Sequence, residues 1–464
     1  MSFKKGAMYV FFANIINLMI SLFTGFVLPK YLSVETYADI KLFQLYITYV
    51  GILHLGFSDG MYLRHGGKNI KEIEKKDILS EFKTFKLFQV IVAIIAVAIS
   101  LIMHKKILLC CSLVIFPINV ANYLKSLYQS VGEFKRYSRF TYLNTMLIFI
   151  INVILLFIIK SNDANLYIVL YVIAYFVYFA FIEIINRKIF KPEKVDADKK
   201  YLYEDIKSGF FLMIGNFCNV IFTSIDRIFV KYLIGKVEFA YYSFAVSIEN
   251  LMTVFITPIS TVMYNYLCKN REKENVLRIK RIVLLFSSII VAVVFPAKFV
   301  IEHWIEKYNS SISVLFLLFA AQYISIMVRC VHINLYKSEK KQNRYFTIMS
   351  LIVILSIILN GVFFAIGRTM EMIALATLLT NIIWFVIGEL DFKNYRLKIK
   401  DYFYTFSILI IFILCGLTNS SVIGFVMYVA TTLIMILLLM PETLKYCTNE
   451  ISKIIKNHSN IRIK

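Results

Sequence analysis

The chain has few of the residues that interrupt helices or carry redox and metal chemistry. Only 6 of its 464 residues are proline, and its 7 cysteines show neither metal-ligand spacing nor the pattern of a disulfide framework. Most of these cysteines lie in apolar runs, where a thiol acts as a small packing residue. We therefore expect no metal site and no cofactor.

Acidic residues are also scarce. The chain has 29 Asp and Glu against 51 Lys and Arg, a net charge of +22. In a soluble protein this excess would suggest nucleic acid as a partner, but much of it lies in short loops between apolar runs, so we expect no nucleic acid. The absence of a glycine-rich loop ending in GK[ST] argues against an ATP-driven pump. No Asp-rich nucleotide-sugar motif stands out either.

Long apolar runs dominate what is present. Apolar residues make up 59% of the chain, and its mean hydropathy is +0.72. Runs of about 20 residues, long enough to cross a hydrocarbon core of ~30 Å, recur along the whole length. The sequence predicts an all-α integral membrane protein with about fourteen spans. The expected spans are 7–29, 37–58, 84–103, 107–127, 140–160, 165–186, 207–230, 238–264, 279–300, 311–335, 345–367, 370–390, 402–418 and 421–440.

The first apolar run is longer than the core of a signal peptide, and no small-residue cleavage pattern follows it. We therefore expect it to be retained as a span. Lysine and arginine concentrate in alternate loops, among them 59–83, 128–139 and 187–206. Because basic loops stay on the cytoplasmic side, this alternation predicts an even number of spans with both termini cytoplasmic.

A polar stripe appears twice in this apolar sequence, at the helical spacing i, i+3, i+7, i+10. A polar face inside a membrane helix must point at protein or water. Two copies predict two similar six-helix bundles that run in the same direction and face a shared polar cavity. The stripes are Asn14, Asn17, Ser21 and Thr24, and Asn216, Asn219, Thr223 and Asp226.

The longest polar stretch between spans is dense in charge and contains Pro192. It separates the two copies of the repeat. We therefore predict four parts, namely an N-terminal six-helix bundle at 1–187, a cytoplasmic linker at 188–206, a C-terminal six-helix bundle at 207–392, and an additional helix pair with a basic tail at 393–464.

The segment from Ser224 to Gly235, SIDRIFVKYLIG, is followed by VEFAYYSFA from Val237. It resembles a block at spans seven and eight of the oligosaccharide flippase branch of the multidrug/oligosaccharidyl-lipid/polysaccharide (MOP) exporter superfamily. The span count, the linker position and the two six-helix halves with a terminal hairpin are also similar to that family. One departure is that the first half has Thr24-Gly25 where the second has Asp226-Arg227. The halves are therefore not chemically equivalent at this level.

The resemblance implies translocation of undecaprenyl-diphosphate-linked oligosaccharide units across the bacterial cytoplasmic membrane, for O-antigen, capsule or lipopolysaccharide-type polymers. It implies a non-enzymatic alternating-access mechanism with H⁺ or Na⁺ as candidate coupling ions. Implied partners are membrane lipids, a polymerase and other polysaccharide-assembly proteins. Two alternatives remain open, an ion-coupled multidrug antiporter of the same fold and a membrane polysaccharide polymerase. The short outside loops disfavour the polymerase.

Flipping needs a cationic site for the pyrophosphate and a polar cavity for the sugars. The strongest candidate pair is Asp226 with Arg227, for which the alternative is a structural ion pair. Arg329 is a second cavity cation or a side chain that snorkels to the headgroups. The remaining substrate-binding candidates are Asn14, Asn17, Asn216, Asn219, Lys41, Arg64 and Lys207.

Four basic residues fall at cytoplasmic span ends. They predict either a funnel that recruits the diphosphate headgroup or positive-inside anchors. They are Arg64, Lys125, Arg139 and Lys207. The candidate coupling residues are His54, Glu183 and Glu249, for each of which the alternative is a packed or ion-paired structural role.

Overall fold

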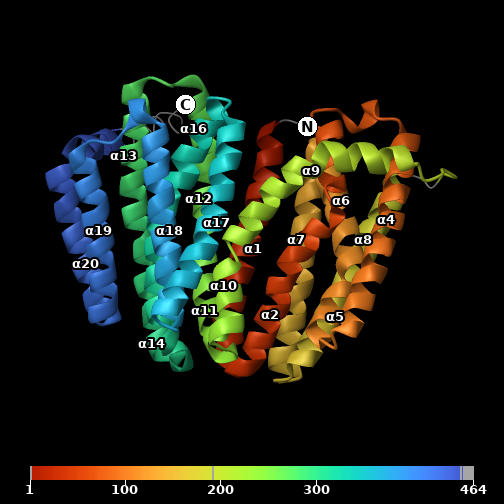
Figure 1. Cartoon of the computed structure of the whole chain (residues 1–464), viewed down its shortest axis with the longest axis horizontal. Helices are drawn as coiled ribbons and strands as arrows, with labels where there is room; N and C mark the ends of the chain where they lie inside the picture. The colour runs from red at the N-terminus through yellow and green to blue at the C-terminus, as the bar shows by residue number, and fades with distance from the viewer. Residues whose placement is uncertain (1–2, 191–192, 450–451, 453–464) are drawn as a thin grey trace, which may run out of the picture. The chain divides into compact units, whose positions relative to one another are not determined.

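The computed structural model describes residues 3–190, 193–449 and 452, with side chains from residue 16 onward except at positions 71, 261 and 265. Within this part of the chain the regular secondary structure is helical, without strands. The chain forms two compact units, Met1–Ser224 and Ile225–Lys464, whose helices are drawn in Figure 1.

The first unit consists of apolar helices with polar caps. Its helices are α1 (Phe3–Tyr31), α2 (Val34–Val50), α3 (Phe57–His65), α4 (Lys75–Ile102), α5 (Lys106–Leu113), α6 (Ile115–Ser130), α7 (Phe134–Val153), α8 (Ala164–Ile189) and α9 (Lys199–Phe222). Ser33 Oγ accepts a hydrogen bond from the Thr36 amide (3.2 Å) at the start of α2. Asp198 Oδ1 accepts one from the Lys200 amide (2.8 Å) at the start of α9. These caps satisfy amides that a helix start leaves without partners.

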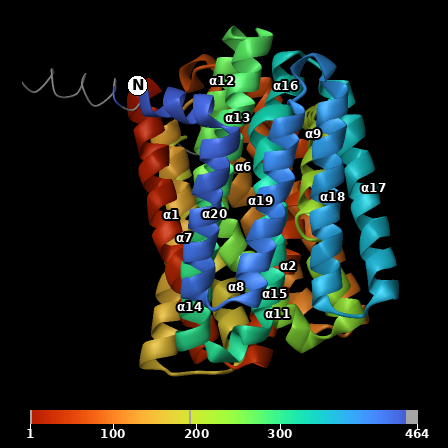
Figure 2. The ribbon, with the colours of Figure 1, turned by 90° about the vertical axis from the view of Figure 1, so that its left-hand side faces the viewer.

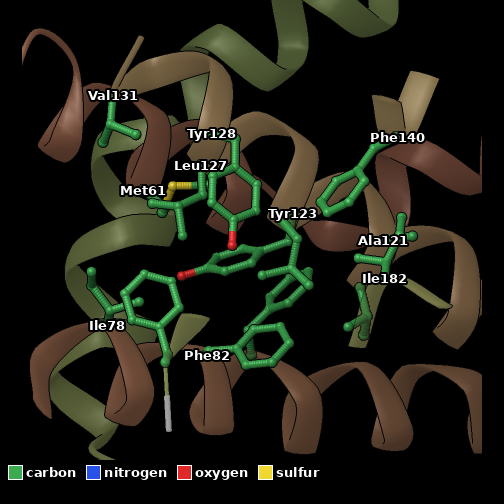
Figure 3. Close-up of a cluster of buried hydrophobic side chains, with 14 of the residues drawn as sticks. Met61, Ile78, Phe82, Ala121, Tyr123, Leu127, Tyr128, Val131, Phe140 and Ile182 are labelled. Carbon is green, nitrogen blue, oxygen red and sulfur yellow. The ribbon is translucent and has the colours of Figure 1, made fainter. Parts of the chain in front are cut away.

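One hydrophobic cluster joins α3, α4 and α6 in this unit. The ring of Tyr123 lies 5.5 Å from that of Phe82 and 4.8 Å from that of Phe85, both stacked. Figure 3 shows Tyr123 and Tyr128 among the other side chains of the cluster. Stacked aromatic pairs contribute packing beyond their buried area, so this cluster fixes the helices around it.

The second unit is built around α15. Its helices are α10 (Ile225–Phe229), α11 (Lys236–Glu249), α12 (Thr253–Lys269), α13 (Lys273–Ile290), α14 (Val294–Trp304), α15 (Ile312–Met327), α16 (Ile333–Ser338), α17 (Gln342–Ile366), α18 (Met370–Asp391), α19 (Ile399–Thr418) and α20 (Ser421–Leu439). Every residue of α15 from Val314 to Met327 is buried, since α11, α13, α18 and α19 pack around it. A helix that is apolar on every side requires such an enclosed position.

The predicted C-terminal helix pair belongs to this unit. Helices α19 and α20 pack against each other, α19 also contacts α15, and α20 also contacts α14. In Figure 2 they run side by side.

In the described residues, eleven helices are long and apolar enough to cross a membrane, or up to thirteen if each of two bent pairs is one span. A shorter apolar helix at Ile16–Tyr31 adds to these. The predicted multi-span, all-helical fold is confirmed, whereas the count of fourteen stays a prediction.

Helix α9 groups with the first unit because it packs against α3 and α4. In Figure 1 its start crosses the ends of neighbouring helices of that unit. The division at 188–206, which assigns this helix to the second half, comes from the sequence repeat and stays a prediction about the architecture.

Candidate functional site

The chain bends within the expected span 37–58. α2 continues through a short 3₁₀ turn to His54, and α3 then leaves at 61°. At the bend Leu55 has φ 49° and Gly56 has φ 90°, a left-handed conformation that is free for glycine and uncommon for other residues. His54 Nδ1 accepts a hydrogen bond from the Gly56 amide (3.0 Å).

Three glycines let the backbones of α3 and α9 touch. A Cβ on Gly60 would lie 2.1 Å from the carbonyl oxygen of Asp205, and a Cβ on Gly209 would lie 2.1 Å from that of Gly56. Small residues at a membrane helix crossing permit this approach. The crossing brings the polar side chains of both helices into one region.

A buried acid–base cluster lies beside this crossing. The Arg64 guanidinium of α3 forms an ion pair with Asp205 of α9, and its other terminal nitrogen is 3.8 Å from Glu81 Oε2 of α4. Glu81 also contacts His65 Nε2 (2.9 Å) and accepts a hydrogen bond from Tyr123 OH (2.8 Å). Both carboxylates are buried, and the single arginine supplies positive charge that they share.

A second polar group links the bend to the α9 stripe. Asn216 Nδ2 donates to Asp59 Oδ1 (3.3 Å), and His54 Nε2 lies 3.7 Å from Asp59 Oδ2. The side chain of the predicted coupling residue His54 therefore faces a carboxylate of α3. The structure thus brings His54 and Asn216, two predicted site residues far apart in sequence, to one acid.

Three members of the second polar stripe are exposed. Asn216 and Asn219 lie on α9 and Thr223 directly follows it, and Lys207 is exposed earlier on the same helix. Lys207 Nζ lies 5.6 Å from the centroid of the Tyr203 ring. A polar face on an apolar helix needs water, protein or a polar ligand against it.

The first stripe is described in part. Thr24 Oγ1 donates to the Ile20 carbonyl (2.9 Å), and the buried Oδ1 of Asn17 accepts no hydrogen bond from the described residues. The side chain of Asn14 lies outside the described part of the structure.

In the second unit, four predicted residues come together as two acids and two bases. Asp226 is buried; its Oδ2 accepts a hydrogen bond from Tyr242 OH (2.9 Å) and its Oδ1 one from the Arg227 amide (2.7 Å). Glu249, at the end of α11, interacts electrostatically with Arg329, Asp226 and Arg227. The charges of this quartet sum to zero, so no member is an isolated charge in the apolar interior.

Arg329 and His332 lie in a π-helical turn, Val328–His332, that follows α15. The two residues engage different carboxylates, Arg329 through its Coulomb interaction with Glu249 and His332 through a 2.9 Å contact of Nε2 with Glu389 Oε1. π-helical turns shift the register of a helix and are frequent at functional sites.

Glu389 anchors a network that the sequence reasoning missed. Lys280 Nζ lies 2.6 Å from Glu389 Oε1, and Tyr402 OH donates to Glu389 Oε2 (2.8 Å). Both Lys280 and Glu389 fall within predicted spans. A charged residue inside an apolar run is the signal that could have found this network.

The remaining candidates have protein neighbours. Glu183 Oε1 contacts Lys86 Nζ and Arg187 Nε, each at 3.2 Å. Lys41 Nζ lies 5.2 Å from the Tyr37 ring centroid. Of the predicted funnel residues, Arg64 is ion-paired, Arg139 and Lys207 are exposed, and Lys125 lines a cavity inside the first unit.

Among the described residues, no group of three or more His, Cys, Asp and Glu side chains is arranged to hold a metal ion. The second unit instead offers guanidinium groups among carboxylates, which can exchange an internal partner for an anionic ligand. The first unit offers an exposed row of amide and hydroxyl groups, which can bind hydroxyl-rich molecules.

The fold is that of known membrane transporters. The structure of lipid II flippase MurJ in an inward closed conformation matches with a TM-score of 0.69 and 16% identity, over 95% of this chain and 99% of that chain. The inward-facing structure of a multidrug resistance MATE family transporter of the MOP superfamily matches with a TM-score of 0.58 and 13% identity, over 82% of this chain and 98% of that chain. The structure of an outward-facing multidrug resistance MATE family transporter matches with a TM-score of 0.52 and 13% identity, over 84% of this chain and 96% of that chain. The protein is therefore a multi-span membrane protein with the fold of these MurJ and MATE structures.

A protein-family model identifies the family of this chain. The model described as "Polysaccharide biosynthesis protein" matches residues 3–270, more than half of the chain. The chain belongs to this polysaccharide biosynthesis protein family, and the resemblance found in its residues is confirmed. Comparison with curated protein sequences gives no match.

Proposed function

We propose that the protein flips undecaprenyl-diphosphate-linked oligosaccharide units across the bacterial cytoplasmic membrane for a surface polysaccharide of the O-antigen or capsule type. The observation that carries this proposal is the family match over residues 3–270 in a chain whose fold is MurJ-like over 95% of its length. The lipid II flippase gives the precedent of a lipid-linked saccharide moved by this fold. Flipping makes and breaks no covalent bond, so the protein is not an enzyme.

The quartet of the second unit supports a binding site for the diphosphate. Arg227 and Arg329 are cations that interact electrostatically with the carboxylates of Asp226 and Glu249. A diphosphate that binds the two arginines displaces the carboxylates, because charge-assisted hydrogen bonds to phosphate are strong and bidentate for arginine. A displaced Glu249 then takes up H⁺ or Na⁺, which couples ion binding to substrate binding.

The exposed stripe of α9 supports the sugar site. Asn219 and Thr223 present amide and hydroxyl groups along one helix face, and hydroxyl-rich sugars exchange hydrogen bonds with such groups. The orientation follows from the basic loops, with both termini on the cytoplasmic side. Contact with a polymerase would let the flipped units be consumed on the outer side.

The test is deletion and complementation in the native host, with lipid-linked repeat units measured in each leaflet. Loss of the protein should leave these units on the cytoplasmic leaflet. Arg227→Ala and Arg329→Ala should fail to restore transport at normal protein levels, whereas Arg271→Ala, at an exposed arginine outside the quartet, should restore it. Normal transport in the deletion strain would exclude the proposed function.

A second candidate is an ion-coupled antiporter for small molecules. Two observations favour it, the similarity to a multidrug MATE transporter and the buried carboxylates Glu81 and Asp205 in the first unit. Its signature is a deletion strain that gains drug sensitivity while its lipid-linked repeat units reach the outer leaflet at the normal rate. This outcome separates the two functions in one strain.

A further inference from the structure

The first unit contains a partly open polar cavity that the proposed transport site does not use. Helices α2, α6, α7 and α8 surround about 250 Å³, and Lys125, Asn122 and Asn144 are among the lining residues. Since a water molecule takes about 30 Å³ of liquid volume, this space holds a small group of waters or one small solute. Its lining residues Asn122 and Lys125 belong to the candidate membrane span Lys106–Ser130.

Lys125 is the only charged residue lining the cavity. Within the described residues, neither an ion pair nor a hydrogen bond joins its ammonium group to another residue. By contrast, the two buried lysines in the described part have partners: Lys280 contacts Glu389, and Lys298 donates to the carbonyl of Gly416 (2.7 Å). An ammonium without a counter-charge in an apolar bundle is costly. The cavity is therefore short of one negative charge.

The neighbouring polar groups complete a binding surface. Asn122 precedes Lys125 by three residues on α6, so the two side chains share a helix face. The buried Oδ1 of Asn144, on α7, receives no hydrogen bond from the described residues. By contrast, Tyr178 OH already donates to the Phe140 carbonyl (2.8 Å). The cavity thus offers a cation and an amide beside an acceptor that still requires a donor.

We propose that this cavity binds a small oxyanion that carries a hydroxyl group, with Lys125 as its counter-charge. The anionic oxygens accept hydrogen bonds from Lys125 and the Asn122 amide, and the hydroxyl group donates to Asn144 Oδ1. Hydrogen phosphate and the carboxylate end of a sugar acid both have this chemistry. The first would come from solution, and the second would be carried by a saccharide substrate. The site does not depend on the proposed flippase activity, since binding is measured without a lipid substrate.

The test uses the full-length protein in lipid nanodiscs, with radiolabelled inorganic phosphate and glucuronate as separate probes and thermal unfolding in parallel. At least one probe should bind saturably and raise the unfolding midpoint. Lys125→Met should weaken binding at least tenfold without lowering the midpoint in anion-free buffer, since it removes an uncompensated charge. Asn122→Asp, which places a carboxylate beside Lys125, should also abolish binding and keep the protein folded. Lys188→Met, an exposed lysine, should match the wild type.

Each outcome bears on the proposal. Phosphate binding alone identifies a free anion as the ligand, and glucuronate binding alone identifies a sugar acid. Absence of binding by both probes to the wild type overturns the proposal. Unchanged binding in Lys125→Met overturns it as well. A lower unfolding midpoint for Lys125→Met in anion-free buffer would assign the lysine to a structural contact instead.

Discussion

Several charged side chains in the interior of the described structure lie in mixed groups of acids and bases. Arg64 is held by Asp205 and Glu81, and Arg281 donates from Nε to both oxygens of Asp401 at 3.1 and 3.2 Å. Removing one partner of such a group leaves an uncompensated buried charge, which costs more than the pair itself contributes. A substitution that removes one member of such a group should therefore lower the stability of the protein.

Arg64→Ala should destabilise the protein by about 3–5 kcal/mol, because it leaves two buried carboxylates without their cation. Equilibrium unfolding of the purified protein measures the change. Arg64→Ala combined with Asp205→Asn should recover part of the loss, since one carboxylate charge is removed. Arg187→Ala, at an exposed arginine, is the control and should have little effect. Equal stability of Arg64→Ala and the wild type would contradict the buried cluster.

Tyr242→Phe should cost about 1.5–3 kcal/mol, the usual contribution of a hydrogen bond to a charged group. The phenol donates to Asp226 Oδ2 at 2.9 Å, and the ring itself is kept, so packing is unchanged. Tyr241→Phe is a matched control on the next residue. If the two variants unfold alike, the hydrogen bond to Asp226 does not hold the quartet in place.

The sequence analysis named each of the four quartet residues as a candidate, and it named Arg64. It missed Glu81 and Asp205, the carboxylates that surround Arg64, for a physical reason. Asp226 and Arg329 interrupt apolar runs, where charge is rare and therefore informative. Glu81 and Asp205 fall in stretches expected to be loop and linker, beyond the apolar runs. Helices α4 and α9 begin earlier, at Lys75 and Lys199. Hydropathy predicts the apolar part of a helix and misses the polar turns that extend it.

At the scale of elements, the apolar runs predicted the helices well, whereas the interruptions were missed. The bend between α2 and α3 depends on the left-handed conformations of Leu55 and Gly56. A Leu-Gly pair within an apolar run has the same hydropathy whether the backbone is straight or bent. The glycine crossing of α3 and α9 joins Gly60 to a partner more than a hundred residues away, and a single sequence contains no signal for that pairing.

Gly209→Ala should disrupt the crossing of α3 and α9. Its Cβ would lie 2.1 Å from the Gly56 carbonyl oxygen, so the helices must separate at a cost of about 1–3 kcal/mol or more. Gly215→Ala, on the same helix, meets nothing within 4 Å and should stabilise the protein by up to about 1 kcal/mol through helix propensity. Thermal unfolding of both variants checks the contrast. Similar midpoints would show that α3 and α9 do not touch at these glycines.

The segment after α8 is attached to α4 by charged contacts. Glu193 pairs with Lys75, and Lys83 Nζ donates to the Val195 carbonyl (2.7 Å). The hydrogen bond from Lys75 lowers the pKa of Glu193 below its ordinary value of 4.5. The carboxylate is therefore charged and paired above the lowered pKa, and the pair is lost as the pH falls through it.

A nitroxide label at Lys194→Cys, in a background without the native cysteines, should report this change. Its mobility by electron paramagnetic resonance should rise when the pH falls through the lowered pKa of Glu193. With Glu193→Gln the label should be mobile at every pH. A label that is immobile at low pH would show that the ion pair does not hold this segment.

At the scale of the whole molecule, alternating access predicts that cavity residues change sides. Cysteines placed singly at Asn219, Asp226 and Arg329 should react with membrane-impermeant reagents from both sides of the membrane. Lipid-linked saccharide should shift the balance between the two sides, because it stabilises one state over the other. If the cysteines reacted from one side only and substrate had no effect, this would argue against alternating access by movement of the two halves.

The enclosed helix α15 also has a consequence for how the chain is made. Synthesis proceeds from the N-terminus, so α15 emerges before α18 and α19, which later cover two of its sides. Until then, its buried Gln322 and Ser325 have only the earlier helices and lipid around them. The second unit is thus completed only when its last helices arrive. A ribosome that stops short of α18 leaves a membrane-inserted intermediate in which α15 lacks the cover of α18 and α19.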